Sequence, residues 1–182
     1  MSDAASNHCG NFSEHDQRGL TETAALQEQQ EQQLQALKQS GLLLDQQLCF
    51  PLYAASNLVI KAYGPLLKPL GLTYPQYLVM LALWQHQQMS VGELGKQLHL
   101  DSGTLTPLLK RMESNGLVLR QRSTTDERRV NVSLTTAGKE LQQQAATVPE
   151  AMACRMAGDG QWLRQLQADL NLLIERVEQS NA

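Results

Sequence analysis

Cys49 is the residue of this sequence whose type and position offer the clearest chemistry. It stands near the expected start of a long helix, where exposed amide groups and the positive end of the helix dipole stabilise a thiolate. Tyr53 follows one turn later, Tyr63 lies at the end of the same expected helix, and Tyr74 lies at the start of the third. Phenol hydroxyls can donate hydrogen bonds to a thiolate, so an activated thiol is chemically sensible. A lone cysteine on an amphipathic helix is more often a small buried core residue, and the pattern leaves both interpretations open.

A second set of residues concentrates positive charge between positions 102 and 134. Its six basic residues are Lys110, Arg111, Arg120, Arg122, Arg128 and Arg129. With three acidic residues the stretch has a net charge of +3, whereas the whole chain is at −3, so the remainder carries −6. Such segregation favours contact with the phosphates of DNA at one surface. The alternative is that these charges only solvate an amphipathic helix and a hairpin.

Residues 102–115 are expected to form a helix with one apolar and one polar face. Asp101 and Ser102 are suited to cap its start, and Gly116 is a stop signal. Pro107 lies just past the first turn, so it removes one backbone donor without preventing the helix. The apolar face consists of Leu105, Leu108, Leu109 and Met112. The opposite face, which could enter a major groove, carries Ser102, Thr104, Thr106, Lys110 and Arg111.

After Gly116 the hydrophobic period changes to two, as expected for a half-buried hairpin. The alternating apolar residues are Leu117, Leu119, Val130, Val132 and Leu134. The hairpin tip, residues 123–129, carries Asp126, Glu127, Arg128 and Arg129. With Arg122, which precedes the tip, Asp126, Arg128 and Arg129 complete the predicted DNA-contacting set.

A helix-turn-helix is predicted directly before this hairpin. Ser90 and Glu93 form a capping box that opens a short helix through Leu98. Residues 99–101 are then the turn into the next helix. Because strands follow the second helix, the pattern is typical of a winged helix.

Helices with heptad-like apolar stripes are expected on both sides of this unit. The first starts near Asp45 and ends at Gly64 and Pro65; a later one is bent at Pro149, and the last has leucines at three- and four-residue spacing. The fold class expected is mainly α with a small β-hairpin wing. Residues 1–40, polar and rich in Gln, are expected to be a mostly disordered tail, and 41–182 a single domain. Dimerisation helices at about 45–70 and 136–180 would flank a DNA-binding unit at about 74–134, unless the stripes pack within one chain.

Composition limits the function classes further. Hydrophobic content of 42% and charged content of 18% are ordinary for a globular protein, and no membrane span or secretory signal is expected, so a cytoplasmic protein is predicted. Cys9, Cys49 and Cys154 form no CxxC pair, which makes a disulfide scaffold unlikely. His8, Cys9 and His15 are a weak metal-site pattern, so neither a metal nor a cofactor is expected.

Four blocks in this order resemble the MarR family of winged-helix dimers, and within it the organic hydroperoxide repressors. The blocks are LDQQLCF at 44–50, GLTYPQYL at 71–78, LDSGTLTPLLKR at 100–111 and DER at 126–128. The resemblance covers about residues 44–177. Pro51 departs from the usual pattern after Phe50, and Cys9 matches nothing in it.

The resemblance implies a role for each matching residue. Cys49 matches the sensing cysteine that organic hydroperoxides oxidise to a sulfenic acid. Tyr63 and Tyr74 match the tyrosines that hydrogen-bond this thiol from the partner subunit. Cys154 matches the resolving cysteine of the two-cysteine subclass, which forms an intersubunit disulfide with the sensor and moves the reading heads off DNA.

The same resemblance implies that Asp126 orients Arg128 for the minor groove. The function expected is a homodimeric transcriptional repressor that binds a double-stranded DNA operator and leaves it on oxidation by an organic hydroperoxide. One alternative is a repressor released by a small phenolic ligand, with Cys49 incidental. Another is a thiol peroxidase that turns over hydroperoxide at Cys49, although an enzyme has no need of a basic wing.

Overall fold

The computed structural model describes residues 14–123, 126, 129–156 and 160–180. It divides into two compact units, residues 1–56 and 57–182. The boundary falls inside a helix rather than at 40/41, and the expected division into a tail and a single domain stays a prediction. None of the described helices combines the length and the apolar character that crossing a membrane requires.

The first unit contains helix α1 (Glu14–Gln39), the 3-10 helix η1 (Leu44–Gln46) and the start of α2 (Cys49–Leu67). Helix α1 occupies the stretch for which the sequence predicts mostly disorder. From residue 25 to residue 40 its side chains are exposed except that of Leu37, which is half-buried. Because residues 25–39 of α1 bury no apolar side chain, tertiary packing contributes little to the stability of this part of the helix.

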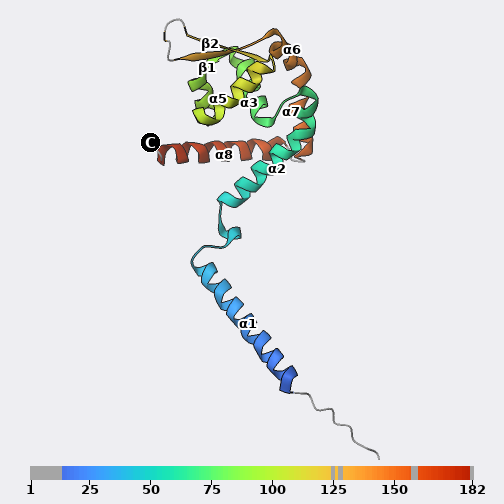
Figure 1. Cartoon of the computed structure of the whole chain (residues 1–182), viewed down its shortest axis with the longest axis vertical. Helices are drawn as coiled ribbons and strands as arrows, with labels where there is room; N and C mark the ends of the chain where they lie inside the picture. Colours follow the sequence, from blue (N-terminus) through green and yellow to red (C-terminus); the bar gives the residue numbers. More distant parts are fainter. Residues whose placement is uncertain (1–13, 124–125, 127–128, 157–159, 181–182) are drawn as a thin grey trace, which may run out of the picture. The chain divides into compact units, whose positions relative to one another are not determined.

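The second unit holds the predicted winged helix and the elements after it. These elements are η2 (Lys68–Leu70), α3 (Tyr74–His86), β1 (Gln88–Ser90), α4 (Val91–Leu98), α5 (Ser102–Ser114), β2 (Val118–Arg122), β3 (Val130–Leu134), α6 (Thr136–Ala145), α7 (Val148–Arg155) and α8 (Gly160–Ser180). Figure 1 shows β1 and β2 lying over α5 and α3 in this unit, as the packing of α5 on β2 and of α3 on β1 requires.

The sheet has three antiparallel strands in the order β1-β3-β2. The wing hairpin β2–β3 was predicted, whereas β1 was not, because three residues are too few to establish a period of two. The ladder of β1 and β3 ends at the pair Ser90 and Asn131. The short strand therefore ties the start of α4 to the base of the wing.

The core of this unit gathers one face from each helix and the inner face of the sheet. Leu105, Leu109 and Met112 of α5 are fully buried, as their spacing predicted. The core also contains Leu67, Met80, Leu83, Leu94, Val118 and Val132. Burial of this apolar surface holds α5 with its polar face outward.

Three helix boundaries differ from the prediction. Helix α2 begins at Cys49 rather than near Asp45, because residues 44–46 form the separate 3-10 helix η1. Helix α2 does not end at Gly64 and Pro65 but continues to Leu67. Pro65 lies in the last turn, where a missing amide removes a single hydrogen bond. The helix expected to bend at Pro149 is in fact two helices, α6 and α7, with Pro149 in the first turn of α7, a position at which proline is favourable.

The phase of the first wing strand was also predicted wrongly. Leu119 is 47% exposed, while Val118 is fully buried and pairs with Leu134. The reason is local: α5 ends with Gly116 in a left-handed conformation at φ 70°, and Leu117 only links that turn to the strand. Inward alternation therefore begins one residue later than the apolar pattern indicates.

Candidate nucleic-acid interface and thiol site

The helix-turn-helix is fixed by a cap at the start of each helix. The Ser90 hydroxyl accepts a bond from the Glu93 amide, and the Glu93 carboxylate accepts bonds of 2.7 Å from the Ser90 amide and hydroxyl. Asp101 accepts bonds of 2.8 Å from the amide of Thr104 and 2.9 Å from its hydroxyl. Both predicted caps are confirmed. These bonds satisfy amides that no helix turn could satisfy.

The polar face of α5 is available to a partner. Ser102, Thr104, Lys110 and Arg111 are exposed, and Thr106 is half-buried. Within the described part of the chain neither Lys110 nor Arg111 forms an ion pair. The cationic charge of this face is therefore not neutralised by a neighbouring carboxylate.

Two other arginines of the basic stretch are paired within the chain. The Arg120 Nε donates to the Glu113 carboxylate at 2.9 Å, and the Arg120 amide donates to it at 3.1 Å. These bonds hold the pKa of Glu113 below its ordinary value. The pair joins β2 to α5, so Arg120 stabilises the packing of the wing on α5.

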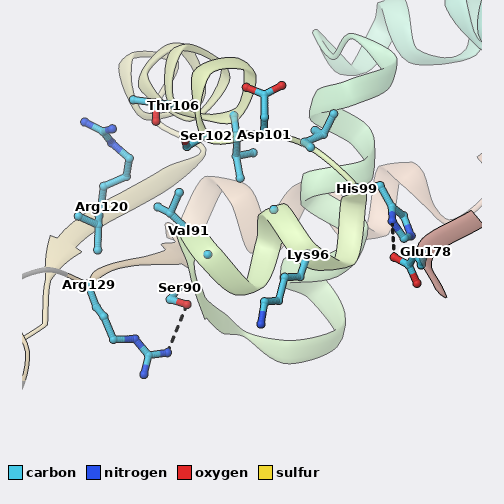
Figure 2. Close-up of a pocket in the computed structure, with 15 residues that line it drawn as sticks. Ser90, Val91, Lys96, His99, Asp101, Ser102, Thr106, Arg120, Arg129 and Glu178 are labelled. Carbon is cyan, nitrogen blue, oxygen red and sulfur yellow. Dashed lines mark hydrogen bonds and ion pairs between the residues drawn. The ribbon is translucent and has the colours of Figure 1, made fainter. Parts of the chain in front are cut away.

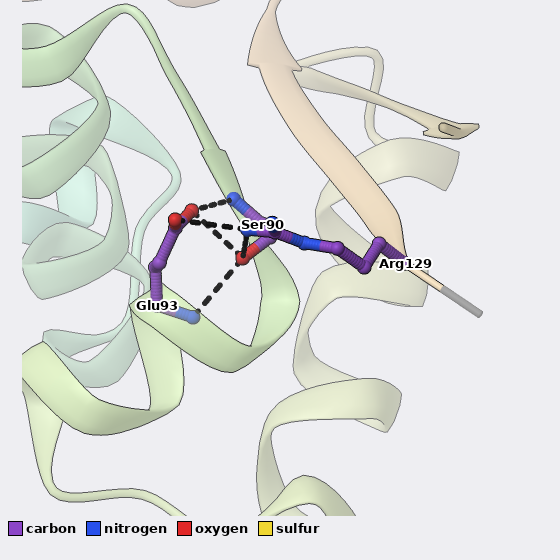
Figure 3. A network of polar contacts seen from close by, with 3 residues as sticks. All are labelled: Ser90, Glu93 and Arg129. Atoms are coloured by element: carbon purple, nitrogen blue, oxygen red, sulfur yellow. Dashed lines mark hydrogen bonds and ion pairs between the residues drawn. The ribbon is translucent and has the colours of Figure 1, made fainter. Parts of the chain in front are cut away.

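Arg129 lies at the end of the wing loop and reaches back to α4 (Figure 3). Its Nη2 donates to the Glu93 carboxylate at 3.0 Å and to the Ser90 hydroxyl at 3.4 Å. The bonds from Ser90 and the charge of Arg129 hold the pKa of Glu93 below its ordinary value. Arg129 was predicted to contact DNA, and the structure gives its guanidinium partners inside the chain.

The described part of the wing tip is compact. The Asp126 amide donates to the Ser123 hydroxyl at 3.3 Å, and the Asp126 carbonyl accepts from the Arg129 amide at 2.9 Å. Arg122 ends β2 with an exposed side chain. Arg128, assigned to the minor groove with Asp126, lies outside the described residues, as does Glu127.

A hollow of about 1000 Å³ opens between α4, α5, the base of the wing and the end of α8. Figure 2 shows Lys96, Arg120 and Arg129 around it, with the Asp101 and Ser102 end of α5 on the far side. The His99 Nδ1 lies 3.2 Å from the Glu178 carboxylate at one edge. The hollow thus adjoins the α5 surface predicted to contact DNA.

The two described thiols are exposed and free. Cys49 is the first residue of α2, and its position near the start of this helix is as predicted. Its side chain is exposed, so it is not a core residue of this chain. Pro51 falls within the first turn, where no intrahelical amide bond is lost. Cys154 lies in α7, and Cys9 lies outside the described residues. Among the described residues no cluster of His, Cys, Asp and Glu could hold a metal ion.

Tyr63 and Tyr74 lie against each other in the second unit. Their ring centroids are 4.7 Å apart, and Tyr77 lies 5.9 Å from Tyr63. Burial raises the pKa of both Tyr63 and Tyr74, and the charges of Tyr74 and Tyr77 raise the pKa of Tyr63 further. Both phenols therefore stay protonated at neutral pH, the state that donates a hydrogen bond.

The end of α7, which carries Cys154, is joined to α2 by one hydrogen bond. The Arg155 Nη1 donates to the Ala62 carbonyl at 3.2 Å, which joins the end of α7 to α2 one residue before Tyr63. Cys49 belongs to the first unit, whereas Tyr63, Tyr74 and Cys154 belong to the second.

Sequence reasoning missed several contacts of this site. Tyr77 had a signal, since it follows Tyr74 by three residues and so shares its helix face. The Arg129 and Glu93 pair had none, because 36 residues separate its members and each was already assigned another role.

Known proteins similar to this chain are transcriptional regulators. A family model described as "Transcriptional regulator SarA/Rot" matches residues 61–145. The chain is 49% identical to the "Organic hydroperoxide resistance transcriptional regulator" of Bacillus subtilis over 138 residues, 76% of this chain and 94% of that protein. Reduced AbfR bound to DNA aligns with a TM-score of 0.67 and 35% identity, over 80% of this chain and 99% of the other. Disulfide-formed AbfR aligns with a TM-score of 0.52 and 39% identity, over 77% and 98%. AbfR is a Staphylococcus epidermidis protein.

Proposed function

Because this chain belongs to the MarR family of winged-helix transcriptional regulators, we propose that it is a DNA-binding repressor that leaves its operator when an organic hydroperoxide oxidises Cys49. The observation that carries the DNA-binding part is the exposed, unneutralised cationic face of α5 opposite its fully buried apolar face. The similarity to a regulator solved on DNA supports it. The protein acts where its operator is, in the cytoplasm.

The DNA contacts divide between the helix and the wing. In the major groove the contacts are made by Ser102, Thr104, Thr106, Lys110 and Arg111. In the adjacent minor groove they are made by Arg122 and Arg128, with Asp126 orienting Arg128. Hydroxyls and cations are the groups that suit phosphates and base edges at these places.

Two copies of the chain bind two half-sites of one operator. Helix α8 has no buried residue, and its exposed apolar side chains include Trp162, Leu166, Leu172, Ile174 and Val177. A second chain that covers this surface gains the free energy of apolar burial and fixes the spacing of the two wings.

The redox step uses the two described thiols and an external oxidant. The Cys49 thiolate attacks the distal oxygen of the hydroperoxide, the O–O bond breaks, and the alkoxide leaves and takes up a proton as an alcohol. Cys49 is then a sulfenic acid. The Cys154 thiol of the other subunit attacks its sulfur, which forms the disulfide and releases water. The protonated phenols of Tyr63 and Tyr74 donate hydrogen bonds to the thiolate before the reaction.

Formation of this bond changes which dimer geometry is favoured. A disulfide requires Cα atoms about 4.4–6.8 Å apart. The start of α2 in one subunit, which carries Cys49, must therefore come within that distance of the end of α7 in the other subunit, which carries Cys154. The reduced dimer has wings spaced for the operator, and the oxidised dimer has them spaced differently. Similarity to a regulator solved in a disulfide-formed state supports such a mechanism.

The test combines nonreducing electrophoresis with fluorescence anisotropy on a duplex that the full chain selects from a random-sequence pool. Cumene hydroperoxide is added to wild type, Cys49→Ser and Cys154→Ser, with Cys9→Ser as the matched thiol control. We expect wild type and Cys9→Ser to form a covalent dimer and lose at least about tenfold in affinity. Cys49→Ser should stay bound, and Cys154→Ser should form no covalent dimer. Release of Cys49→Ser by the peroxide would contradict the sensor assignment.

A further inference from the structure

We propose that Arg129 is a positioning residue, which fixes the angle of the wing on the helix-turn-helix through Glu93 and does not act as a DNA phosphate contact. The inference rests on the proposed DNA-binding function and assigns one of its basic residues to a different task. Its geometry is the network in Figure 3, in which the arginine of the wing meets the capping box of α4.

Arg129 continues the attachment of the wing beyond the end of the sheet. The last pair of the β1–β3 ladder joins Ser90 to Asn131, and among the described wing residues β1 pairs with none beyond Asn131. Arg129 comes two residues before Asn131, and its side chain crosses to Ser90 and Glu93 at that point. Beyond the last backbone pair, the side chain of Arg129 thus connects the wing to Ser90 and Glu93.

The backbone of Arg129 is held as firmly as its side chain. Its carbonyl accepts from the Ser123 amide at 2.8 Å, and its amide donates to the Asp126 carbonyl at 2.9 Å. These two bonds close the base of the wing loop. The contact of the Arg129 side chain with Glu93 therefore also restrains the positions of Ser123 and Asp126, to which the Arg129 backbone is bonded.

Glu93 is built to receive this arginine. One carboxylate oxygen, Oε2, closes the capping box with the amide and hydroxyl of Ser90. The other oxygen, Oε1, accepts from Arg129. Because the cap already fixes the carboxylate, it presents one oxygen in a defined place and loses little further side-chain freedom on pairing.

Stability alone does not account for the pair. The Arg129 and Glu93 side chains are 53% and 54% exposed, and ion pairs that are open to solvent contribute little to the free energy of unfolding. Their effect on geometry is larger, since a small rotation at the base displaces the tip. Simultaneous contact of α5 with the major groove and of the wing with the next minor groove requires that angle to be defined.

The two possible roles of Arg129, positioning the wing or contacting phosphate, predict opposite changes in DNA affinity for Glu93→Gln. Gln closes a capping box as Glu does, so the substitution keeps the cap while it removes the negative charge and the second oxygen, which accepts from Arg129. If Arg129 positions the wing, Glu93→Gln weakens binding to the selected duplex about three- to tenfold, although it removes a negative charge beside DNA. If Arg129 contacts phosphate, the same change leaves the affinity equal or raises it.

The experiment measures anisotropy with the full reduced chain, on the duplex selected from a random pool and on a scrambled duplex of equal length. The variants are Glu93→Gln, Arg129→Gln, the double variant and Glu140→Gln, which makes the same charge change on an exposed residue of α6. We expect both single variants to weaken the selected duplex only, the double variant to be no weaker than Arg129→Gln, and Glu140→Gln to match wild type. Thermal unfolding confirms that each variant is folded at the assay temperature.

Three results would overturn the inference. The first is unchanged or tighter binding of the selected duplex by Glu93→Gln. The second is an equal effect of Arg129→Gln in the wild-type chain and in the Glu93→Gln chain. The third is an equal loss of affinity by Arg129→Gln for the selected and the scrambled duplex. Failure of the wild-type chain to select any duplex is a separate outcome, because it rejects the proposed DNA-binding function itself. Arg129→Gln alone distinguishes the two roles by the ratio of its effects on the two duplexes, should Glu93→Gln not fold.

Discussion

Asp101 caps the start of α5, and the same hydrogen bonds that form the cap lower the pKa of its carboxyl group. Two hydrogen bonds from Thr104 hold its pKa below the ordinary value of 3.8. A carboxylate whose pKa is lower in the folded chain contributes stability above the unfolded pKa, and this contribution is lost as the pH falls through the folded pKa. Helix α5 therefore loses the charged form of its N-terminal cap only in acid.

We expect Asp101→Asn to lower the melting temperature by a few degrees at neutral pH, because Asn caps the helix without the charge. The difference from wild type should shrink as the pH falls below 3.8, where Asp101 of the unfolded chain is already protonated. Calorimetric melting from neutral pH to about pH 2.5 measures it. Asp45→Asn, in the exposed η1, controls for the loss of one carboxylate. A difference that stays constant into acid would refute the charge-based explanation.

At the scale of elements, α6 packs against the start of the wing at a glycine, Gly138, that leaves no room for a side chain. A Cβ added to Gly138 would stand 2.2 Å from the Leu117 carbonyl oxygen, which is backbone and cannot move aside cheaply. The Trp84 Nε1 donates to the Gly138 carbonyl at 2.9 Å, and the Thr135 hydroxyl donates to the Gly116 carbonyl at 2.6 Å. This junction joins α3, α6 and the wing.

We expect Gly138→Ala to lower the free energy of unfolding by about 1–3 kcal/mol, since the backbone must shift to admit the methyl group. Gly92→Ala is the matched control, because Gly92 also lies in a helix and a Cβ there meets nothing within 4 Å. That control should be neutral or more stable by about 0.5–1 kcal/mol. Urea unfolding of both variants measures the two values. Equal stabilities would mean that α6 shifts freely on the wing.

The sequence predicted those elements whose signals are local. The Ser90 and Asp101 caps and the buried face of α5 each follow from a few adjacent residues. It did not predict β1, the phase of β2 or the partners of Arg120 and Arg129. A three-residue strand carries no period, and the partner of an arginine several turns away is decided by the packing of whole elements, which no local pattern records.

At the scale of the whole molecule, the apolar face of α8 determines whether the wings work as a pair. Leu166 is 40% and Val177 50% exposed in the single chain, and their spacing of eleven residues places both on one face of the helix. Such exposed apolar surface is unfavourable unless a second chain covers it. Two reading heads that are joined bind two half-sites together, so the second contact costs much less entropy than the first. Dimerisation and operator affinity should therefore fail together.

We expect Leu166→Glu to raise the dimer dissociation constant at least about tenfold, because a charge buried in an apolar interface has no partner there. Sedimentation velocity across a concentration series measures this. Gln167→Glu, an equal charge change at an exposed polar position of the same helix, should leave the dimer intact. Affinity for the selected duplex should fall in Leu166→Glu at concentrations where the chain is a monomer and recover as the concentration rises. A monomeric variant with wild-type affinity would show that one wing suffices, and the operator would then need only one half-site.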